Sequence, residues 1–520
     1  MQSLADITRT QAAERPDTDA LICDDRTLTY AELDAEANRV ANALVAAGVG
    51  SQDRVGFVGK NIPEYFTLLF GAAKVNAVTV AVNWRLAPPE MAYILNNAEA
   101  KVVLVEEEFL GHIEGVELDA APMIVVAGNA GDHTGYADWI EGRSTDDPAY
   151  PSVEDDTAVQ LYTSGTTGLP KGAELSNRNF FSIAGPVSDM VKLHDDSVLL
   201  HVMPLFHIGG SGVAIVGLFK GAVNVVHRDV DPNRILADIE KRRVTASFMV
   251  PALLQFLPLM PGASDTDFSS LEMILYGASP ITEPVLTASM ALLKAPHAQA
   301  YGLTETTGVV TLLLPEDHDP GGPRAELLRS AGKPVDGVEL KVVDAEGNEV
   351  PDGEVGEIWV RTVQNLKGYW KNPEATDEVY PQGRDENGLG WFRTGDAAYM
   401  KDGYVFIHDR VKDMIVSGGE NIYPAEIENA IMSHPGVADV AVIGIPSEKW
   451  GESPLALIVP AEGEDPSEDD IVAHCRELLA GFKLPKGVER IDAIPRNPSG
   501  KILKTELRTP YWEGRERAVN

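Results

Sequence analysis

Two patterns of apolar and polar residues alternate over the first 310 positions of the chain. Short apolar runs typical of buried strands, such as Arg54–Val58, alternate with stretches whose apolar residues recur at helical spacing, such as Ala31–Ala47 and Pro63–Val75. The alternation returns after residue 190, where the strand-like runs are Val198–Met203, Ala222–Val226, Ser247–Val250 and Met273–Tyr276. This βα alternation predicts two largely parallel sheets with helices on their faces.

The pattern changes twice in the rest of the chain. Residues 330–409 carry short Val- and Ile-rich segments between turn signals such as Asp344–Asn348, which favours a small antiparallel β-barrel. After Asp409 the pattern is that of a compact α+β unit, with a helix beginning at Pro424 and a capping-box spacing at Ser467–Asp470. We therefore predict an α/β fold with an N-terminal domain over residues 1–409 (two βα-type sheet subdomains plus the barrel) and a small α+β domain over residues 410–520.

The composition is that of a globular protein with several domain-sized units. The chain has 520 residues, of which 44% are hydrophobic and 23% charged. Met1–Pro16 lacks the pattern of a secretory leader, and no apolar run approaches the length of a transmembrane helix, so we expect a cytoplasmic protein. Cys23 and Cys475 have no metal or redox spacing, and Cys475 falls on a helical apolar stripe, which predicts a buried thiol.

The formal net charge of −36 excludes nucleic acid as an expected partner and argues against anionic membranes. An anionic substrate must therefore depend on local cations. Those that fall in the motifs below are Lys171, Arg393, Arg410, Lys412 and Lys501.

A glycine-rich stretch, Tyr162–Gly172, is the most informative part of the sequence. Its three glycines allow a tight backbone bend, and its four aliphatic hydroxyls and Lys171 can donate to phosphate oxygens. It follows the apolar run Ala158–Leu161, and hence the carboxyl end of a predicted strand, where ligands of α/β sheets bind. It is not a Walker A loop, because Lys171 is followed by glycine. Taken alone, its Gly-Thr-Thr-Gly core is equally compatible with a surface turn.

Eight further blocks follow in order, and together with the loop they resemble the adenylate-forming enzymes: acyl-CoA synthetases, amino-acid adenylation domains and firefly-type luciferases. The blocks are Met203–Gly210, Tyr276–Pro280, Tyr301–Gly308, Gly356–Arg361, Trp391–Asp396, Asp409–Asp413, Ser417–Pro424 and Pro498–Lys501. The resemblance runs from about residue 25 to 505. It implies that ATP and Mg²⁺ convert a carboxylic acid to an acyl adenylate, and that the C-terminal domain is mobile about a hinge near residues 410–413.

The resemblance also assigns nucleotide contacts. Glu305 is implied as the Mg²⁺ ligand, a role that suits a hard carboxylate oxygen. Asp396 and Arg410 are implied to bind the ribose, although by spacing alone they are a turn aspartate and a surface ion-pair partner. The remaining implied contacts, from phosphates to adenine, are Thr163, Ser164, Gly165, Thr166, Thr167, Gly168, Lys171, Gly277, Ala278, Ser279, Tyr301, Gly302, Thr304 and Lys501.

The same resemblance implies a catalytic set of Lys501, Glu305, Thr304 and His207. Lys501 is expected to contact carboxylate and α-phosphate oxygens during adenylation. His207 is expected to gate the acyl tunnel, with general-base catalysis as the alternative. Lys412 matches the hinge pivot, where aspartate is the commoner residue, and Gly419 is expected to border the channel for the pantetheine of coenzyme A.

The relatives differ in their substrates. No aspartate follows Phe206 within the tunnel loop to pair with an amino acid, and the chain ends Ala518–Asn520 instead of Ser-Lys-Leu, which argues against an assembly-line module or a luciferase. The residues of the implied acyl pocket have small and mostly apolar side chains: His207, Gly210, Val250, Ala278, Ala300, Gly302 and Gly308. We expect a bacterial-type fatty-acyl-CoA ligase for a medium- or long-chain aliphatic acid.

Several alternatives stay open at this point. The acid can instead be an aryl, hydroxycinnamic or steroid side-chain acid, and the acceptor can be a carrier protein instead of coenzyme A. A nucleotide-binding regulator without turnover is a third reading, and the sequence leaves a homodimer open.

Overall fold

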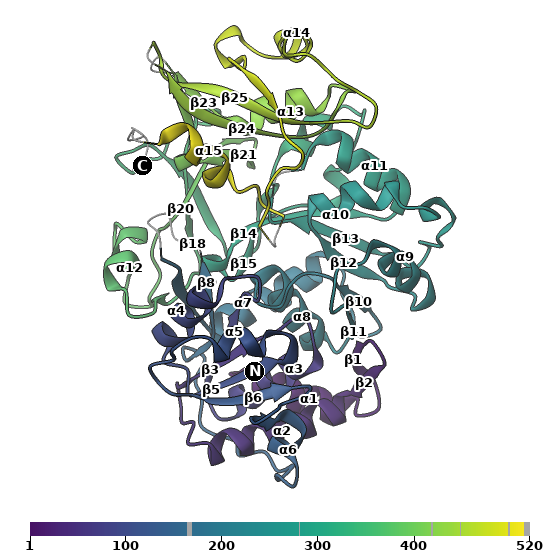
Figure 1. The fold of residues 1–520 in the computed structure, drawn as a ribbon, viewed down its shortest axis with the longest axis vertical. Coiled ribbons are helices and arrows are strands. Elements are labelled where there is room, and N and C mark those ends of the chain that lie inside the picture. Colours follow the sequence, from purple (N-terminus) through teal and green to yellow (C-terminus); the bar gives the residue numbers. More distant parts are fainter. Residues whose placement is uncertain (164–168, 280, 418–419, 448, 498–499, 514–520) are drawn as a thin grey trace.

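The computed structural model describes residues 1–163, 169–279, 281–417, 420–447, 449–497 and 500–513. Figure 1 shows the N-terminal helices at the bottom together with strands β3, β5 and β6, strands β12–β15 in the middle, and the C-terminal elements at the top. The loop residues Ser164–Gly168, as well as Gly419, lie outside the described residues.

The first sheet has eight strands and holds both ends of the glycine-rich loop. Its strands β3, β4 and β5 pair in parallel and are buried along their whole length, because helices cover both faces. Strands β8 and β9 pair antiparallel with Thr163 opposite Lys171, so this hairpin fixes the two ends of the loop. The strand order is β19 (Gly368–Tyr369), β9 (Lys171–Ser176), β8 (Thr157–Thr163), β4 (Val78–Val82), β3 (Arg54–Val58), β5 (Val102–Glu106), β6 (Met123–Ala127) and β7 (Thr134–Gly135).

The helices of this half are α1 (Ala5–Glu14), α2 (Tyr30–Ala46), α3 (Pro63–Lys74), α4 (Pro88–Ala98), α5 (Leu110–Glu114) and α6 (Tyr136–Ile140).

The second sheet has nine strands, and those from β14 to β1 run parallel. Its order is β16 (Lys333–Pro334), β15 (Gly308–Leu313), β14 (His297–Leu303), β13 (Met273–Gly277), β12 (Ala246–Met249), β10 (Val198–His201), β11 (Val223–Val226), β1 (Asp19–Cys23) and β2 (Arg26–Thr29). The helices that follow are α7 (Asn177–Met190), α8 (Ile208–Lys220), α9 (Pro232–Lys241), α10 (Pro251–Phe256) and α11 (Glu283–Leu293).

Helix α8 lies between the two sheets. Its residues Ala214, Ile215 and Leu218 belong to the core of the first half, while Val213 packs against the core of the second. One helix therefore has apolar contacts on both sides, which explains why its sequence is apolar almost all round.

The third unit is an antiparallel sheet of β17 (Glu339–Val343), β18 (Gly356–Arg361), β20 (Phe392–Lys401) and β21 (Tyr404–Arg410). Helix α12 (Pro373–Val379) lies between β18 and β20 in the sequence. The antiparallel pairing agrees with the prediction, but the described strands pair in linear order and form an open sheet instead of the expected barrel. One face packs on Val310 of β15 through Ile358, Val360, Ala398 and Val405. Closure is not needed to bury this face, because the second sheet already covers it.

The C-terminal unit is the predicted α+β structure. Helix α13 (Pro424–Met432) begins at its proline, and α14 (Glu468–Leu478) begins at a capping box, in which Ser467 Oγ accepts from Asp470 N at 3.2 Å. Cys475 is buried in the core of this unit, as predicted. The other elements are β22 (Ile415–Ser417), β23 (Glu420–Ile422), β24 (Val437–Ser447), β25 (Gly451–Pro460), β26 (Val488–Arg490) and α15 (Lys504–Trp512).

The predicted fold class is confirmed, with element ends shifted by a few residues. The boundary between residues 409 and 410 stays a prediction. Among the residues that the structure describes, no helix is both long and apolar enough to cross a membrane.

Candidate active site

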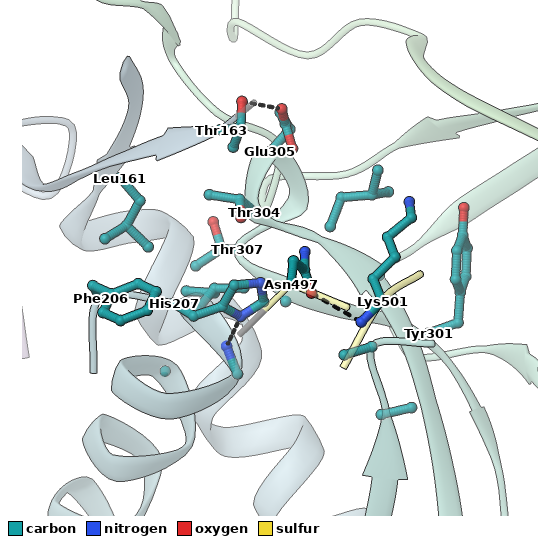
Figure 2. Close-up of a pocket in the computed structure, with 18 of the residues that line it drawn as sticks. Leu161, Thr163, Phe206, His207, Tyr301, Thr304, Glu305, Thr307, Asn497 and Lys501 are labelled. Atoms are coloured by element: carbon teal, nitrogen blue, oxygen red, sulfur yellow. Dashed lines mark hydrogen bonds between the residues drawn. The ribbon is translucent and has the colours of Figure 1, made fainter. Parts of the chain in front are cut away.

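A cavity of about 1520 Å³ joins the carboxyl ends of strands in both large sheets to the C-terminal unit. Figure 2 shows Lys501 beside Tyr301 on one side of it, Glu305 and Thr163 on another, and His207 with Phe206 toward the helices. The cavity has a polar end lined by Thr163, Lys171, Tyr301, Thr304, Glu305, Arg410, Lys412, Asn497 and Lys501. Residues up to about 340 positions apart in the sequence therefore lie around one cavity, as the motifs predict.

The carboxylate of Glu305 is held by two hydroxyl groups. Thr163 Oγ1 donates to Glu305 Oε1 at 3.1 Å, and Tyr369 OH donates to the same oxygen at 3.0 Å (Figure 2 draws the first of these bonds). Glu305 lies in a short 3₁₀ turn, Thr304–Thr306, directly after β14, so the strand delivers it to the cavity. A carboxylate flanked by hydroxyls is a donor set that suits Mg²⁺ bound to phosphates.

Asp396 and Arg410 form an ion pair on neighbouring strands. Arg410 Nε lies 2.7 Å from Asp396 Oδ1, and Tyr301 OH donates to Asp396 Oδ2 at 2.7 Å. Burial alone would lower the pKa of Arg410, but the charge of Asp396 raises it above its ordinary value. Burial, and then the charge of Asp396, raises the pKa of Tyr301, so this phenol stays protonated and donates.

Lys501 extends from the C-terminal unit into the cavity. Its backbone N–H donates to Asn497 Oδ1 at 2.8 Å, which fixes the start of the side chain. Burial, and then the positive charge of Arg410, lowers the pKa of Lys501 to about 8. The lysine is therefore mostly protonated at neutral pH, although its surroundings make the protonated form less stable than it is in water.

The C-terminal unit is seated on the second sheet's helices in this arrangement. Gln255 Nε2 of α10 donates to Ala438 O of β24 at 2.9 Å, and a Cβ placed on Gly500 would lie 3.4 Å from Val250. Lys412, the predicted pivot, lines the cavity, and burial lowers its pKa. Its neighbour Asp413 pairs with Arg508 of α15 at 3.0 Å.

His207 caps the N-terminus of α8. Its Nδ1 accepts from Gly209 N at 3.2 Å, and since a backbone N–H must donate, the ring proton lies on Nε2. Burial lowers the pKa of His207 to about 4, so the ring is neutral at pH 7. This geometry favours the gating role over general-base catalysis, because the lone pair already accepts a bond and Nε2 presents N–H.

The other end of the cavity is an apolar channel between the second sheet and helices α7 and α8. Its lining includes Ile183, Val187, Val191, Leu193, Leu199, Leu200, Gly209, Gly212, Val213, Val216, Ala246, Phe248 and Leu275. The channel residues of α7 and β10 are not among those that the sequence predicts for the acyl pocket. The apolar stripe of α7 was visible, but periodicity cannot distinguish a side chain that faces a channel from one that faces the core.

Ala278, Ala300, Gly302 and Gly308 line the cavity as expected. Five other predicted contacts are absent from its described lining: Gly210, Val250, Gly277, Ser279 and Asp396, which reaches the cavity only through its partner Arg410. Gly210, expected in the acyl pocket, packs inside α8 instead, since a Cβ there would lie 2.1 Å from Pro204 O. Val250 faces the Gly500 loop. Gly277 and Ser279 lie on either side of Ala278, and the buried Ser279 Oγ has no partner among the described residues.

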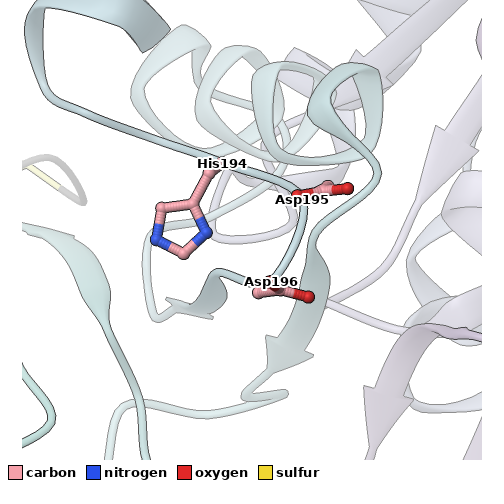
Figure 3. A group of neighbouring side chains, drawn as sticks. All are labelled: His194, Asp195 and Asp196. Carbon is pink, nitrogen blue, oxygen red and sulfur yellow. The ribbon is translucent and has the colours of Figure 1, made fainter.

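His194, Asp195 and Asp196 place three possible metal ligands close together on an exposed loop (Figure 3). Their contacts are explained without an ion, because His194 Nε2 lies 3.1 Å from Glu272 and Asp195 pairs with Arg15 at 2.5 Å. We assign no metal to this group.

Comparison with known proteins identifies the family. The model described as "AMP-binding enzyme" matches residues 8–370, and that described as "AMP-binding enzyme C-terminal domain" matches residues 426–501. This chain belongs to the AMP-binding enzymes. The resemblance to adenylate-forming enzymes is thus confirmed, and the protein is an AMP-forming acid–thiol ligase.

Its relatives act on different acids. A fatty acid–[acyl-carrier-protein] ligase, ScoC, of Streptomyces coeruleorubidus is 42% identical over 100% of this chain and 98% of its own length. A feruloyl-CoA synthase of an Amycolatopsis species is 40% identical (93% and 94% covered), and the long-chain-fatty-acid–CoA ligase FadD13 of Mycobacterium tuberculosis is 38% identical (97% and 96%). Among solved structures, the anthranilate CoA ligase AuaEII with anthranoyl-AMP superposes with a TM-score of 0.90 at 30% identity, covering 98% of this chain and 97% of that one.

Proposed function

We propose that this ligase activates a medium- to long-chain aliphatic carboxylic acid with ATP and transfers the acyl group to coenzyme A. The observation that carries the proposal is the continuity of the cavity. A polar end lined by Lys501, Glu305 and Arg410, the partner of Asp396, opens directly into an apolar channel. Such a site holds a charged head where the reaction occurs and an apolar tail away from it.

In the first step, a carboxylate oxygen of the acid attacks the α-phosphorus of ATP. The bond from this phosphorus to the oxygen bridging the β-phosphorus breaks, and pyrophosphate leaves. Lys501 would hold the carboxylate and an α-phosphate oxygen together, which lowers their mutual repulsion. Lys171, Thr163 and the hydroxyls of Ser164–Gly168 would bind the phosphates.

The remaining nucleotide contacts follow from the same pose. Asp396 would accept from the ribose hydroxyls, with Arg410 and Tyr301 holding its carboxylate in place. Gly277, Ala278, Ser279 and Gly302 would border adenine. Glu305 would hold Mg²⁺ with Thr304 nearby; when bound, the ion supplies charge neutralisation of the phosphates.

In the second step, the thiolate of coenzyme A attacks the acyl carbonyl carbon, and the bond to the AMP oxygen breaks. We propose that the C-terminal domain (410–520) turns about Lys412 between the steps, and that Gly419 then borders the pantetheine. One site can thereby host two reactions in sequence.

The strand register gives an estimate of the acyl chain length. Ala300 and Leu199 both line the cavity; they are three strands apart and, through the pairs Leu199–Ala246–Met273 and Gly277–Ala300, four residues apart along the strands. Spacings of about 4.8 Å between strands and about 3.3 Å per residue place them about 19 Å apart. An extended alkyl chain with C–C bonds of about 1.5 Å advances about 1.25 Å per carbon, so the channel fits about 15 carbons.

An aryl acid is less well supported. In the described lining of the deep channel, the polar side chain is Ser247, whose hydroxyl already donates to Leu200 O at 2.8 Å. A phenol or aniline there would find no ready partner, which costs binding energy.

A carrier protein as acceptor is the second candidate, and the 42% identity with ScoC favours it. The test is a pyrophosphate-release assay with ATP and Mg²⁺ on acids from acetate to palmitate and on coumarate, with coenzyme A, with an acyl-carrier protein, or with neither. Thioester formation on coenzyme A that is maximal for a long aliphatic acid supports the proposal. Transfer only to the carrier protein selects the second candidate, and an absence of release with every acid favours the nucleotide-binding regulator.

A further inference from the structure

Tyr369 contacts both charged groups at the phosphate end of the cavity. Its hydroxyl donates to Glu305 Oε1 at 3.0 Å, and the Lys171 ammonium lies over its ring, 5.4 Å from the centroid. The side chain lines the cavity but is only 8% exposed. Because Glu305 is 64 residues earlier in the sequence, no local motif connects the two.

The segment Leu366–Trp370, here called the strap, joins the strand that begins at Lys171 to the turn that carries Glu305. Leu366 N donates to Glu305 O at 2.7 Å, and Trp370 N donates to Gly172 O at 2.8 Å. Within the strap, Gly368 and Tyr369 form β19 against β9.

The outer end of the strap is fixed by a stacked pair. The Arg54 guanidinium lies 3.3 Å from the Trp370 ring centroid, and Trp370 Nε1 donates to Asn97 O at 3.0 Å. Arg54 also pairs with Glu174 of β9 at 2.8 Å. The backbone of Tyr369 is therefore held on both sides, so its hydroxyl reaches Glu305 from a rigid element.

The two hydroxyls on Glu305 bind the same oxygen. Thr163 and Tyr369 both donate to Oε1, and within the described part of the chain no side chain donates to Oε2. Two donors on one oxygen fix the rotation of the carboxylate and leave Oε2 for a ligand. Burial, and then the charge of Glu305, raises the pKa of Tyr369, so the phenol keeps its proton and acts as a neutral donor.

We propose that Tyr369 is a positioning residue that orients the Glu305 carboxylate for the divalent cation bound to ATP. The inference rests on the proposed function, in which Glu305 meets that cation. Tyr369 acts through Glu305 and does not itself touch the reacting atoms. Its ring also lies under the Lys171 ammonium, which forms no ion pair with Glu305 within the described part of the chain.

The test uses Tyr369→Phe, which removes only the hydroxyl and retains the ring beneath Lys171. Tyr380→Phe is the matched control, because Tyr380 is also buried and donates to Leu366 O of the strap at 3.0 Å, but among the described residues it makes no hydrogen bond with Glu305. The full chain is titrated with Mn²⁺ and ATP by electron paramagnetic resonance, and with ATP in EDTA by calorimetry.

We expect Tyr369→Phe to weaken Mn²⁺–ATP binding about tenfold, the usual effect of losing a hydrogen bond to a charged group. ATP binding in EDTA should change less than twofold, and Tyr380→Phe should change neither. In the Glu305→Gln background the Tyr369→Phe change should have no further effect. Unchanged Mn²⁺–ATP binding, equal weakening in EDTA, or an additive effect with Glu305→Gln would each overturn the proposal.

A kinetic readout separates this proposal from the proposed function. In pyrophosphate release, Tyr369→Phe should raise the Mg²⁺ concentration for half-maximal rate about tenfold, while the KM for the acid stays within twofold. If no acid supports turnover, the proposed function fails but the Mn²⁺ titration still tests Tyr369. If the wild type turns over and the variant shows the same Mg²⁺ dependence, only the role of Tyr369 is wrong.

Discussion

Arg410 Nε lies 2.7 Å from Asp396 Oδ1, at the position where β20 and β21 place these two residues directly opposite each other. The pair closes one side of the cavity just before the chain enters the C-terminal unit. Because Tyr301 of the second sheet donates to the other oxygen of Asp396, two units of the fold meet at one carboxylate.

Asp396→Asn should raise the KM for ATP by about ten- to a hundredfold, since it removes a charged acceptor and the ion pair with Arg410. The kcat at saturating ATP should fall less. Steady-state kinetics with ATP varied checks this, and Asp402→Asn, at the exposed turn of the same hairpin, is the control. An unchanged KM for ATP would exclude the ribose role.

Lys501→Ala should reduce adenylate formation by about two to three decades, because it removes a charge-assisted contact made in the transition state. Thioester formation from supplied acyl-AMP should be nearly unaffected. Separate assays of the two half-reactions check this. Equal loss in both would show that the lysine acts in binding or folding.

The pH dependence of adenylation follows from the same residue. Lys501 must be protonated to act and has a pKa of about 8, so kcat/KM for ATP should fall as pH rises above about 8. In Lys501→Arg this decline should disappear, since a guanidinium stays charged, although the rate itself is lower. If kcat/KM of Lys501→Arg falls with the same midpoint pH, the decline belongs to another titrating group.

Substitutions along the channel should limit the length of the acid in a graded way. Gly212 and Val216 of α8 both line it, and a Cβ at Gly212 meets only the flexible Ile208 side chain at 3.2 Å. Gly212→Phe should therefore fold and exclude long acids, and Val216→Phe, about 6 Å further along the helix, should accept acids about four to five carbons longer. Profiles of rate against chain length check this; identical cut-offs would show that the acid does not follow α8.

A buried ion cluster far from the cavity predicts a stability change. Lys74 is 0% exposed and lies 2.7 Å from Asp34 and 3.1 Å from Asp147. Lys74→Met should lower the free energy of unfolding by about 1.5–3 kcal/mol, because the partly buried Asp34 and Asp147 lose this cation and Asp147 keeps only Arg9. Lys101→Met, which breaks an exposed pair with Asp53, should cost less than about 1 kcal/mol. Urea denaturation of both variants measures the two losses, and equal losses would contradict the prediction.

The same cluster predicts how the free energy of unfolding changes at acidic pH. Burial alone would raise the pKa of Asp147, but the Arg9 hydrogen bond and the Lys74 charge lower it to about 2. A lowered carboxyl pKa contributes stability that is present above the unfolded value near 4 and is lost as pH falls from about 4 to about 2. Wild type should lose more stability over this range than Asp147→Asn, measured by urea denaturation at several pH values; equal losses would contradict the low pKa.

Much of this arrangement can be predicted from the sequence, where the signal is local. The Ser467 capping box and Pro424 each mark a helix start, and the loop motif marks the end of β8. Contacts between distant segments carry no such signal: Tyr369 looks like an ordinary strand aromatic, and Ile183 or Val187 like core residues. Gly210 was misassigned for the same reason, since a glycine beside a channel and a glycine beside a backbone carbonyl look alike in sequence.

Eight Lys and Arg residues line the described cavity, among them Lys171, Arg410 and Lys501, beside six carboxylates, whereas the whole molecule has a net charge of −36. At low salt the net negative charge repels an approaching polyanion before it reaches these cations, whereas at physiological salt the Debye length of about 8–10 Å screens this repulsion. Added salt should therefore accelerate the encounter with ATP and coenzyme A, whereas it slows most electrostatically guided associations. In a concentrated ionic medium the surface charge of this enzyme would repel its substrates less.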